Sequence, residues 1–323
     1  RGPELRAITV FFLACSWIFV LLRCYCRAVL VKAFGLDDGL CLFAQILFTF
    51  FCGFLLASVA WGAGQHMADI EPPSNIPVAV HWWWICGPIY VICNMMLKFS
   101  IGAFLLRLCV SPVQRATLWF VMGTSGIMSA YLFFVLIFQC WPVSYFWEQY
   151  TGMEGSCIDV NIITASAYAY SAISCCTDWT HCILPTYMVW NLQMRRRVKI
   201  TVCLILGISV IASAATIIRI PYIHGFKSSS DFLYAATDLS IWSMVEIGLA
   251  LSSCAAATLH PLYRKVTNHS FGDNTTVHRD IGYPQNTQAS IRAGYVRSDS
   301  GTDHGRREDF EGWRDLGKNT GIS

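Results

Sequence analysis

The sequence predicts an all-α membrane protein, a bundle of seven transmembrane helices with its N-terminus outside and its C-terminus in the cytosol. Of the 323 residues, 55% are hydrophobic and only 13% are charged, whereas about a quarter of the residues of a soluble domain are charged. The apolar residues gather into runs of about 20, the length that crosses a bilayer core about 30 Å thick. Basic residues concentrate in alternate connections between these runs, as they do in cytosolic loops.

Seven apolar runs occupy most of the chain. They lie near residues 7–30, 39–61, 84–108, 116–139, 161–190, 200–220 and 239–260. The fifth run is long enough to tilt or to extend beyond the bilayer at one end. We therefore assign residues 1–265 to one seven-helix membrane domain. Residues 266–323 are polar and contain too little apolar surface to form a core, which predicts a disordered cytosolic tail.

Lys and Arg determine the predicted orientation. Connections on one side are basic, and they contain Arg23, Arg27, Lys32, Arg107, Arg115, Arg195, Arg196, Arg197, Lys199, Arg264 and Lys265. The connections after the second and fourth runs contain no Lys or Arg. Because cytosolic loops are enriched in basic residues, the first set should face the cytosol. The chain begins at Arg1 rather than at Met, so we expect further sequence before it.

Ionisable residues inside the apolar runs are candidate functional residues, because a charge at membrane depth is costly. Lys98 lies in the third run, with Asn94 one turn before it on the same helical face. Asp178 and His181 share one face of the fifth run. A rise of about 1.5 Å per residue places Lys98 and Asp178 at similar depths. We therefore expect an ion pair between the third and fifth helices.

A second pair is predicted between Glu246, in the seventh run, and Arg219, at the outer end of the sixth, whose long side chain can reach inward. Two interpretations of all these groups stay open. They are either structural contacts between helices or a binding site for a ligand or an ion.

Two acidic residues, Asp37 and Asp38, come directly before the second apolar run. Carboxylates at the start of a helix accept hydrogen bonds from its first amides and interact favourably with its dipole. Capping of the second helix is therefore their expected role, with contacts to Arg23 or Arg27 as an addition.

The chain contains 15 cysteines, most of them within apolar runs, where thiols behave as small apolar groups. None has the spacing of a zinc site, so we expect no metal. Cys86, Cys140 and Cys157 face the oxidising side in the predicted topology. One disulfide is expected there, either Cys140–Cys157 or Cys86–Cys157, because sequence alone does not fix the pairing.

Tryptophans gather at the predicted outer boundary, where indole rings prefer the headgroup region. They are Trp61, Trp82, Trp83, Trp84, Trp141 and Trp147. We interpret this cluster as membrane anchoring rather than as a cofactor site.

A family resemblance rests on motifs in a fixed order. These are Arg23 and Arg27 followed by Gly35-Leu36-Asp37-Asp38, Gly62-x-Gly64-x-His66, Lys98 with Phe104 to Arg107, Cys140-x-Pro142 with Trp147 and Cys157, Asp178 with Pro185, Lys199, Gly207, Arg219, Trp242 and Glu246, and Pro261-Leu262. Over residues 5–265 the chain resembles the fungal rhodopsin-like integral membrane proteins, which include satratoxin-cluster membrane proteins and Pth-type receptor-like proteins. The resemblance implies a receptor-like, seven-helix topology in a filamentous fungus, sometimes encoded beside secondary-metabolite genes.

The resemblance implies no established biochemical activity. Retinal proteins need a lysine near the middle of the seventh helix, and residues 238–260 contain none, so we expect no cofactor. Leu106-Arg107-Leu108 stands where animal receptors have a Glu/Asp-Arg-Tyr triplet. Coupling to a G protein by the animal mechanism is therefore not expected.

Three classes of function remain. We rank first a receptor-like protein that lies in a lipid bilayer, binds a small outside ligand among its helices and contacts a cytosolic signalling partner through residues 195–199. A transporter or export accessory protein for a metabolite, using Lys98, Asp178 and Glu246, is the alternative. A membrane enzyme ranks last, because no zinc, nucleophile or phosphate-loop motif is present. A net charge of +3 gives no indication of nucleic-acid binding.

Overall fold

Long helices occupy six of the seven predicted apolar runs in the computed structural model, which describes residues 1–109, 111–191, 231–256 and 258–259. They are α1 (Gly2–Tyr25), continued by the short π-helix η1 (Cys26–Leu30), α2 (Leu36–Ala60), α3 (Asn75–Leu108), α4 (Pro112–Ile137), α6 (Val160–Asn191) and α8 (Phe232–Ala256). All of the described residues belong to one unit of the chain, which ends at residue 274.

Five of these helices, α1 with η1, α2, α3, α4 and α8, are long and apolar enough to cross a membrane. Their outward faces contain large apolar side chains, such as Ile18, Phe120 and Ile127, which are 65%, 71% and 70% exposed. Such a broad apolar surface is found on proteins that face lipid rather than water. The protein is therefore a multi-pass membrane protein.

The remaining two predicted spans are the fifth, which corresponds to α6, and the sixth. α6 has the expected length, but polar residues on its buried face, among them Ser171, Ser174 and His181, make it less apolar than the five helices above. The predicted sixth span, at 200–220, lies outside the described residues, as does the predicted tail at 266–323.

α3 begins at Asn75, earlier than the predicted start near residue 84. The reason is packing beyond the apolar run. Ala79 and Val80 in the added turns are buried against Ile70 and Leu233, so the first turns of α3 are stabilised by contacts that hydropathy does not show.

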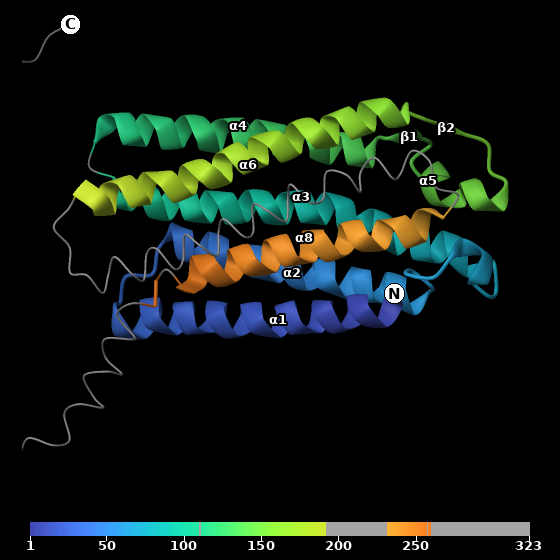
Figure 1. Ribbon diagram of the computed structural model, residues 1–323, viewed down its shortest axis with the longest axis horizontal. Coiled ribbons are helices and arrows are strands. Elements are labelled where there is room, and N and C mark those ends of the chain that lie inside the picture. The colour runs from blue at the N-terminus through green and yellow to red at the C-terminus, as the bar shows by residue number, and fades with distance from the viewer. Residues whose placement is uncertain (110, 192–230, 257, 260–323) are drawn as a thin grey trace, which may run out of the picture. The chain divides into compact units, whose positions relative to one another are not determined.

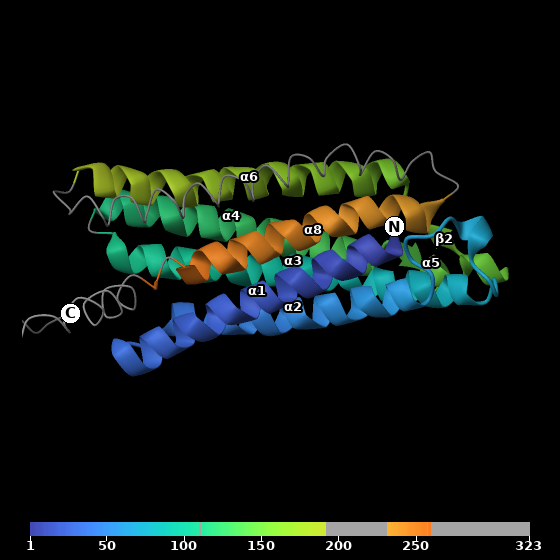
Figure 2. The same cartoon turned by 60° about the horizontal axis from the view of Figure 1, so that its bottom comes forward.

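α3 is the central helix of the described bundle (Figure 1) and contacts α2, α4, α6 and α8. α1 packs against α2 and α8, and α4 packs against α3 and α6. The view in Figure 2 shows the same helices running roughly along one direction, with α1 and α2 on the side away from α6. A continuous buried core, with Phe48, Leu97 and Met244 among its members, joins α2, α3 and α8.

The two ends of the bundle differ in chemistry. One end, which we call the disulfide end, contains η2 (Met67–Asp69), β1 (Cys140–Trp141), α5 (Tyr145–Glu148), η3 (Gln149–Thr151) and β2 (Ser156–Cys157). The N-terminus lies at this end (Figure 1), where the Arg1 amino group donates to the Gly64 carbonyl oxygen at 3.1 Å. Gly64 has a φ of +93° and lies against the backbone of Gly2, an approach that needs glycine.

The opposite end, which we call the arginine end, contains Arg23, Arg27 and Arg107 at the ends of α1, η1 and α3.

The small sheet at the disulfide end has β1 antiparallel to β2, with Cys140 opposite Cys157 and Trp141 opposite Ser156. The basic connections that the structure describes therefore lie at the end opposite the disulfide, as the sequence predicts.

α1 and α8 approach closely at Gly248. A Cβ atom placed on Gly248 would lie 2.5 Å from Cδ1 of Phe12 and 3.0 Å from its Cβ. Small residues allow such close packing between helices in a membrane.

We predict that Gly248→Val lowers the unfolding free energy by about 1–3 kcal/mol, because the added methyl groups overpack the α1–α8 contact. Thermal unfolding in detergent measures this effect as a lower midpoint. Gly123→Val is the matched control, because nothing lies within 4 Å of a Cβ atom at that helical position. Equal midpoints for the two variants would contradict the packing described here.

Candidate functional site

A cavity of about 400 Å³ lies among α3, α4, α6 and α8 at the disulfide end. Small-molecule sites typically measure about 300–1,000 Å³ and have mainly apolar walls. The walls here are formed largely by aromatic and aliphatic side chains, including Trp83, Trp84, Tyr90, Leu136 and Phe232. We call this space the tryptophan cavity.

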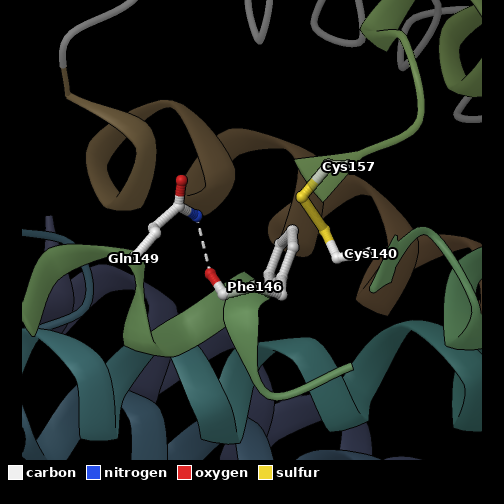
Figure 3. Close-up of a disulfide and its surroundings, with 4 residues drawn as sticks. All are labelled: Cys140, Phe146, Gln149 and Cys157. Carbon is white, nitrogen blue, oxygen red and sulfur yellow. Dashed lines mark hydrogen bonds between the residues drawn. A yellow bond between two sulfur atoms is a disulfide. The ribbon is translucent and has the colours of Figure 1, made fainter. Parts of the chain in front are cut away.

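The segment between β1 and β2 covers the tryptophan cavity. Phe146, Gln149 and Tyr150, from α5 and η3, form part of its wall. Figure 3 shows the Gln149 side chain donating to the Phe146 carbonyl oxygen at 2.7 Å, close to the disulfide. Burial raises the pKa of Tyr150 above its usual value, so its phenol stays neutral at physiological pH.

The predicted disulfide is present between Cys140 and Cys157 and closes the loop that contains this cover (Figure 3). The alternative pairing of Cys86 with Cys157 is wrong. Cys86 is a buried free thiol on α3, and its Sγ faces the carbonyl oxygens of Trp82 and Phe51 at 3.3 and 3.9 Å, so it is engaged within its own helix and with α2.

The prediction that all of the tryptophans are membrane anchors is wrong for Trp83 and Trp84, which line the cavity. Trp147 is also engaged internally, because its ring stacks on His81 at 4.4 Å and lies 5.2 Å from Trp84. Trp141, at 78% exposure, fits the anchoring role. The spacing of Trp83, Gly87 and Tyr90, three or four residues apart on one helical face, is the signal that could have revealed this wall.

The predicted ion pair between α3 and α6 is present. Lys98 Nζ lies 2.7 Å from Oδ1 of Asp178 and also donates to the hydroxyl and the carbonyl oxygen of Ser174, at 2.8 and 2.9 Å. The Lys98 side chain is only 4% exposed. These three contacts satisfy all three donors of the ammonium group.

Glu246 on α8 is buried and is bound by α3. The Tyr90 hydroxyl donates to Oε2 at 2.7 Å, and Nδ2 of Asn94 donates to Oε1 at 3.2 Å. Arg219, the partner that the sequence predicts for Glu246, lies outside the described residues, so that pair stays a prediction. Tyr90, which sequence analysis missed because it has no charge, connects Glu246 to the wall of the tryptophan cavity.

Several polar side chains of α6 face the bundle. Ser171, Ser174 and His181 are all buried. Neither ring nitrogen of His181 has a hydrogen-bond partner among the described residues. We use the name central polar cluster for Tyr90, Asn94, Lys98, Ser174, Asp178 and Glu246.

At the arginine end, Arg23 is buried between α2 and α8. Its Nε lies 2.9 Å from Oδ1 of Asp38, its Nη2 lies 3.0 Å from Oδ2 of Asp37, and its Nη1 donates to the Cys254 carbonyl oxygen at 2.7 Å. Arg23 is 1% exposed and both carboxylates are fully buried. One guanidinium group therefore connects three helices.

Arg27 and Arg107 also contact these two carboxylates. We use the name arginine network for Arg23, Arg27, Asp37, Asp38 and Arg107. Arg107 Nη1 lies 2.7 Å from Oδ1 of Asp37, and two nitrogens of Arg27 lie 3.6 and 3.7 Å from Asp37 and Asp38. The Ser100 hydroxyl donates to the backbone oxygen of Asp37 at 2.6 Å. The network thus joins α1, η1, α2, α3 and α8.

Capping of α2 is only part of the role of the two aspartates. Asp38 accepts a hydrogen bond from the Gly35 amide at 3.1 Å, as predicted, but both carboxylates also bind the buried Arg23. Sequence analysis placed these contacts second because the local pattern shows the cap, whereas the approach of Arg107 depends on how α3 packs.

The chain matches a known protein family over a range that includes the central polar cluster and the arginine network. Residues 22–265 match the family model described as the fungal rhodopsin domain. The chain belongs to this family. No solved structure matches the chain.

Several curated fungal proteins are similar to this fungal rhodopsin domain. Fugralins biosynthesis cluster protein 2 of Gibberella zeae is 24% identical over 243 residues, which cover 71% of this chain and 58% of the relative. The SAT4 family membrane protein of Emericella nidulans is 28% identical over 67% of this chain and 53% of its own length. Receptor GIN3 of Arthrobotrys oligospora is 24% identical over 54% of this chain and 43% of its own. The chain thus spans little more than half of the first two relatives.

Chemically, this fungal rhodopsin domain combines a largely apolar cavity with charges that are paired inside the bundle. Within the described part of the chain, no group of three or more His, Cys, Asp or Glu residues is placed to hold a metal ion. The arrangement is suited to binding and to coupling between helices.

We predict that Arg23→Met lowers the unfolding free energy by about 3–5 kcal/mol, because it removes one member of a buried ion pair. The fully buried Asp38 then keeps only Arg27, at 3.7 Å, as a basic partner among the described residues. Unfolding midpoints and the monodisperse fraction after detergent extraction measure the loss. Arg6→Met is the control, since Arg6 is exposed and its substitution should change either value little. If Arg23→Met had the same unfolding midpoint and the same monodisperse fraction as Arg6→Met, the arginine network would not hold the helices together.

Proposed function

We propose that the protein is a receptor-like, seven-helix membrane protein that binds a small molecule in the tryptophan cavity and transmits the change along α3. The observation that supports this most strongly is the position of Tyr90. Its side chain lines the cavity, while its hydroxyl bonds to the buried carboxylate of Glu246. A ligand in the cavity therefore touches a residue that holds α8 to α3.

The route along α3 follows from helical spacing. Tyr90, Asn94 and Lys98 are four residues apart and share one face. Their partners lie on two other helices, Glu246 on α8 and Asp178 on α6. In a bilayer core no water replaces a lost hydrogen bond, so a displacement of Tyr90 has to be accommodated by neighbouring protein groups. Further along, Ser100 and Arg107 connect α3 to the arginine network.

We further propose that residues 200–220 form the remaining transmembrane helix and that the arginine end faces the cytosol. Two features support this orientation. Basic residues gather at the arginine end, as in cytosolic connections, and the disulfide at the other end suits an oxidising compartment. The loop at 195–199 and the polar tail are then available to a cytosolic signalling partner.

The names of the relatives suggest the biological setting. One is named a receptor, and another is named after a biosynthesis cluster. We propose a role in sensing an extracellular compound or in fungal secondary metabolism. Because residues 238–260 contain no lysine, we propose that the protein works without retinal, and we propose no enzymatic activity.

A transporter or export accessory protein is the second candidate. Lys98, Asp178 and Glu246 favour it, because ionisable groups at membrane depth often form ion or substrate pathways. The receptor remains our first choice because each of these groups has a described partner on another helix, which stabilises one arrangement of the bundle.

The experiment compares Tyr90→Phe with Tyr131→Phe in the native fungus. Both changes remove one phenol hydroxyl, but Tyr131 bonds to Ser166 between α4 and α6 and does not line the cavity. We expect the Tyr90→Phe strain to lose the transcript differences that separate the parent from a deletion strain, and the Tyr131→Phe strain to keep them. Immunoblotting of membranes confirms equal protein levels.

Two results would contradict the receptor. A Tyr90→Phe strain with the parent's transcript profile, at normal protein level, would show that the cavity does not signal through Tyr90. Accumulation of a metabolite inside the deletion strain, without a change in transcripts, would favour the transporter.

A further inference from the structure

We propose that the arginine end binds the phosphate headgroup of an anionic phospholipid, with Arg107, Lys32 and Arg115 as its contacts. This inference goes beyond the proposed function and does not depend on a ligand in the tryptophan cavity. It follows from the depth of these three side chains, from a positive charge that the membrane domain leaves unbalanced, and from exposed apolar side chains beside it.

The three basic side chains lie at the level of lipid headgroups. α2 has 25 residues, so at about 1.5 Å per residue it is roughly 37 Å long and exceeds a bilayer core of about 30 Å. Lys32 lies in the connection that leads into α2, Arg107 in the last turn of α3, and Arg115 in the first turn of α4. Such helix ends reach the region where phosphates lie.

Arg107 is held between two connections of the bundle. Its Nη1 lies 2.7 Å from Oδ1 of Asp37, and a Cβ atom placed on Gly35 would overlap its Nη2. In the next connection, Nε of Arg115 donates to the Cys109 carbonyl oxygen at 3.1 Å, two residues after Arg107. The connections before α2 and before α4 therefore bring their basic groups to the same end of the bundle (Figure 1).

The charge of Arg107 exceeds what the nearby carboxylates balance. Arg23 and Arg27 already lie beside Asp37 and Asp38, which gives two guanidinium groups for two carboxylates. The third guanidinium group, on Arg107, therefore adds an uncompensated positive charge.

No other part of the membrane domain supplies a carboxylate to this end. The remaining Asp and Glu residues of the chain up to residue 265 belong to the disulfide end or to the central polar cluster. Residues 192–230 and 260–265, which lie outside the described residues, contain neither Asp nor Glu. The missing negative charge has to come from outside this domain.

A phosphate can reach these basic groups. The Arg107 side chain is 45% exposed, and Lys32 and Arg115 are exposed as well. A guanidinium group presents two parallel N–H donors to a phosphate, and basic groups near a membrane surface attract anionic lipids. The arginine end therefore has both the charge and the access that a phosphate headgroup requires.

Exposed apolar side chains favour a lipid over a free phosphate. Phe34 and Leu36, on either side of Gly35, are 51% and 81% exposed, and Val113 is 72% exposed. In a bilayer such side chains pack against acyl chains while neighbouring basic groups reach the headgroups. A soluble phosphate compound would gain nothing from them.

The test titrates the full chain in detergent micelles with dioctanoyl phosphatidylinositol 4-phosphate, and native mass spectrometry counts the lipids bound per protein. Dioctanoyl phosphatidylcholine has the same chains with a zwitterionic headgroup. Inositol 1,4-bisphosphate has the phosphates without acyl chains. We expect saturable binding of the phosphatidylinositol phosphate and at least tenfold weaker binding of the other two compounds.

Substitutions locate the binding site. Lys32→Gln combined with Arg115→Gln, which leaves the arginine network intact, should raise the half-saturating lipid concentration about 10- to 30-fold, since each basic group near an anionic surface contributes about a factor of five. Arg107→Gln should raise it about fivefold, and Gly35→Ala should also weaken binding by displacing the guanidinium group. Arg6→Gln, an exposed position at the disulfide end, is the control and should leave the value unchanged. Unfolding midpoints verify that each variant is folded.

Three results would overturn the inference. Equal affinity for phosphatidylcholine would show that the headgroup charge is not recognised. Equally tight binding of inositol 1,4-bisphosphate would replace the lipid by a soluble phosphate compound. Unchanged affinity in the Lys32 and Arg115 double variant would place the bound lipid elsewhere. None of these results bears on the tryptophan cavity, so this inference and the proposed function fail separately.

Discussion

The structure of this fungal rhodopsin domain depends on the pairing of charged side chains inside the helix bundle. A charged group that is buried in a membrane protein needs a partner within the protein, because the hydrocarbon core offers none. In water, Lys98 or Arg23 could remain solvated in any arrangement of helices. In a bilayer, each needs a carboxylate or several oxygens within hydrogen-bond distance. The pairs Lys98–Asp178 and Arg23–Asp38 therefore restrict how α3 can sit against α6 and how α1 can sit against α2.

α3 is the helix on which these requirements meet. It contributes Tyr90 and Asn94 to Glu246, Lys98 to Asp178, and Arg107 to Asp37. The same helix supplies Trp83 and Trp84 to the tryptophan cavity. Part of the cavity wall and the groups that hold the bundle together thus lie on one helix, which is the physical basis of the proposed receptor-like function.

Much of this architecture could be predicted from apolar runs and helical rise. The bounds of α2, α4 and α6 agree with the expected runs, and the similar depth of Lys98 and Asp178 predicted their pairing. The early start of α3 could not be predicted, because it depends on packing of Ala79 and Val80 against Ile70 and Leu233. The choice between Cys86 and Cys140 also needed three-dimensional positions. Tyr90 escaped notice because it carries no charge, and Trp84 was assigned to membrane anchoring because composition at the boundary does not show which rings turn inward.

A double-mutant cycle on Lys98 and Asp178 tests the central claim most directly. The unfolding free energy in detergent is measured for Lys98→Met, Asp178→Leu and the double variant. Each single change should cost about 3–5 kcal/mol, because it leaves one buried charge without its partner, whereas replacing both with apolar groups should cost far less than the sum. Losses that simply add in the double variant would show that the two charges do not stabilise each other and would contradict this account.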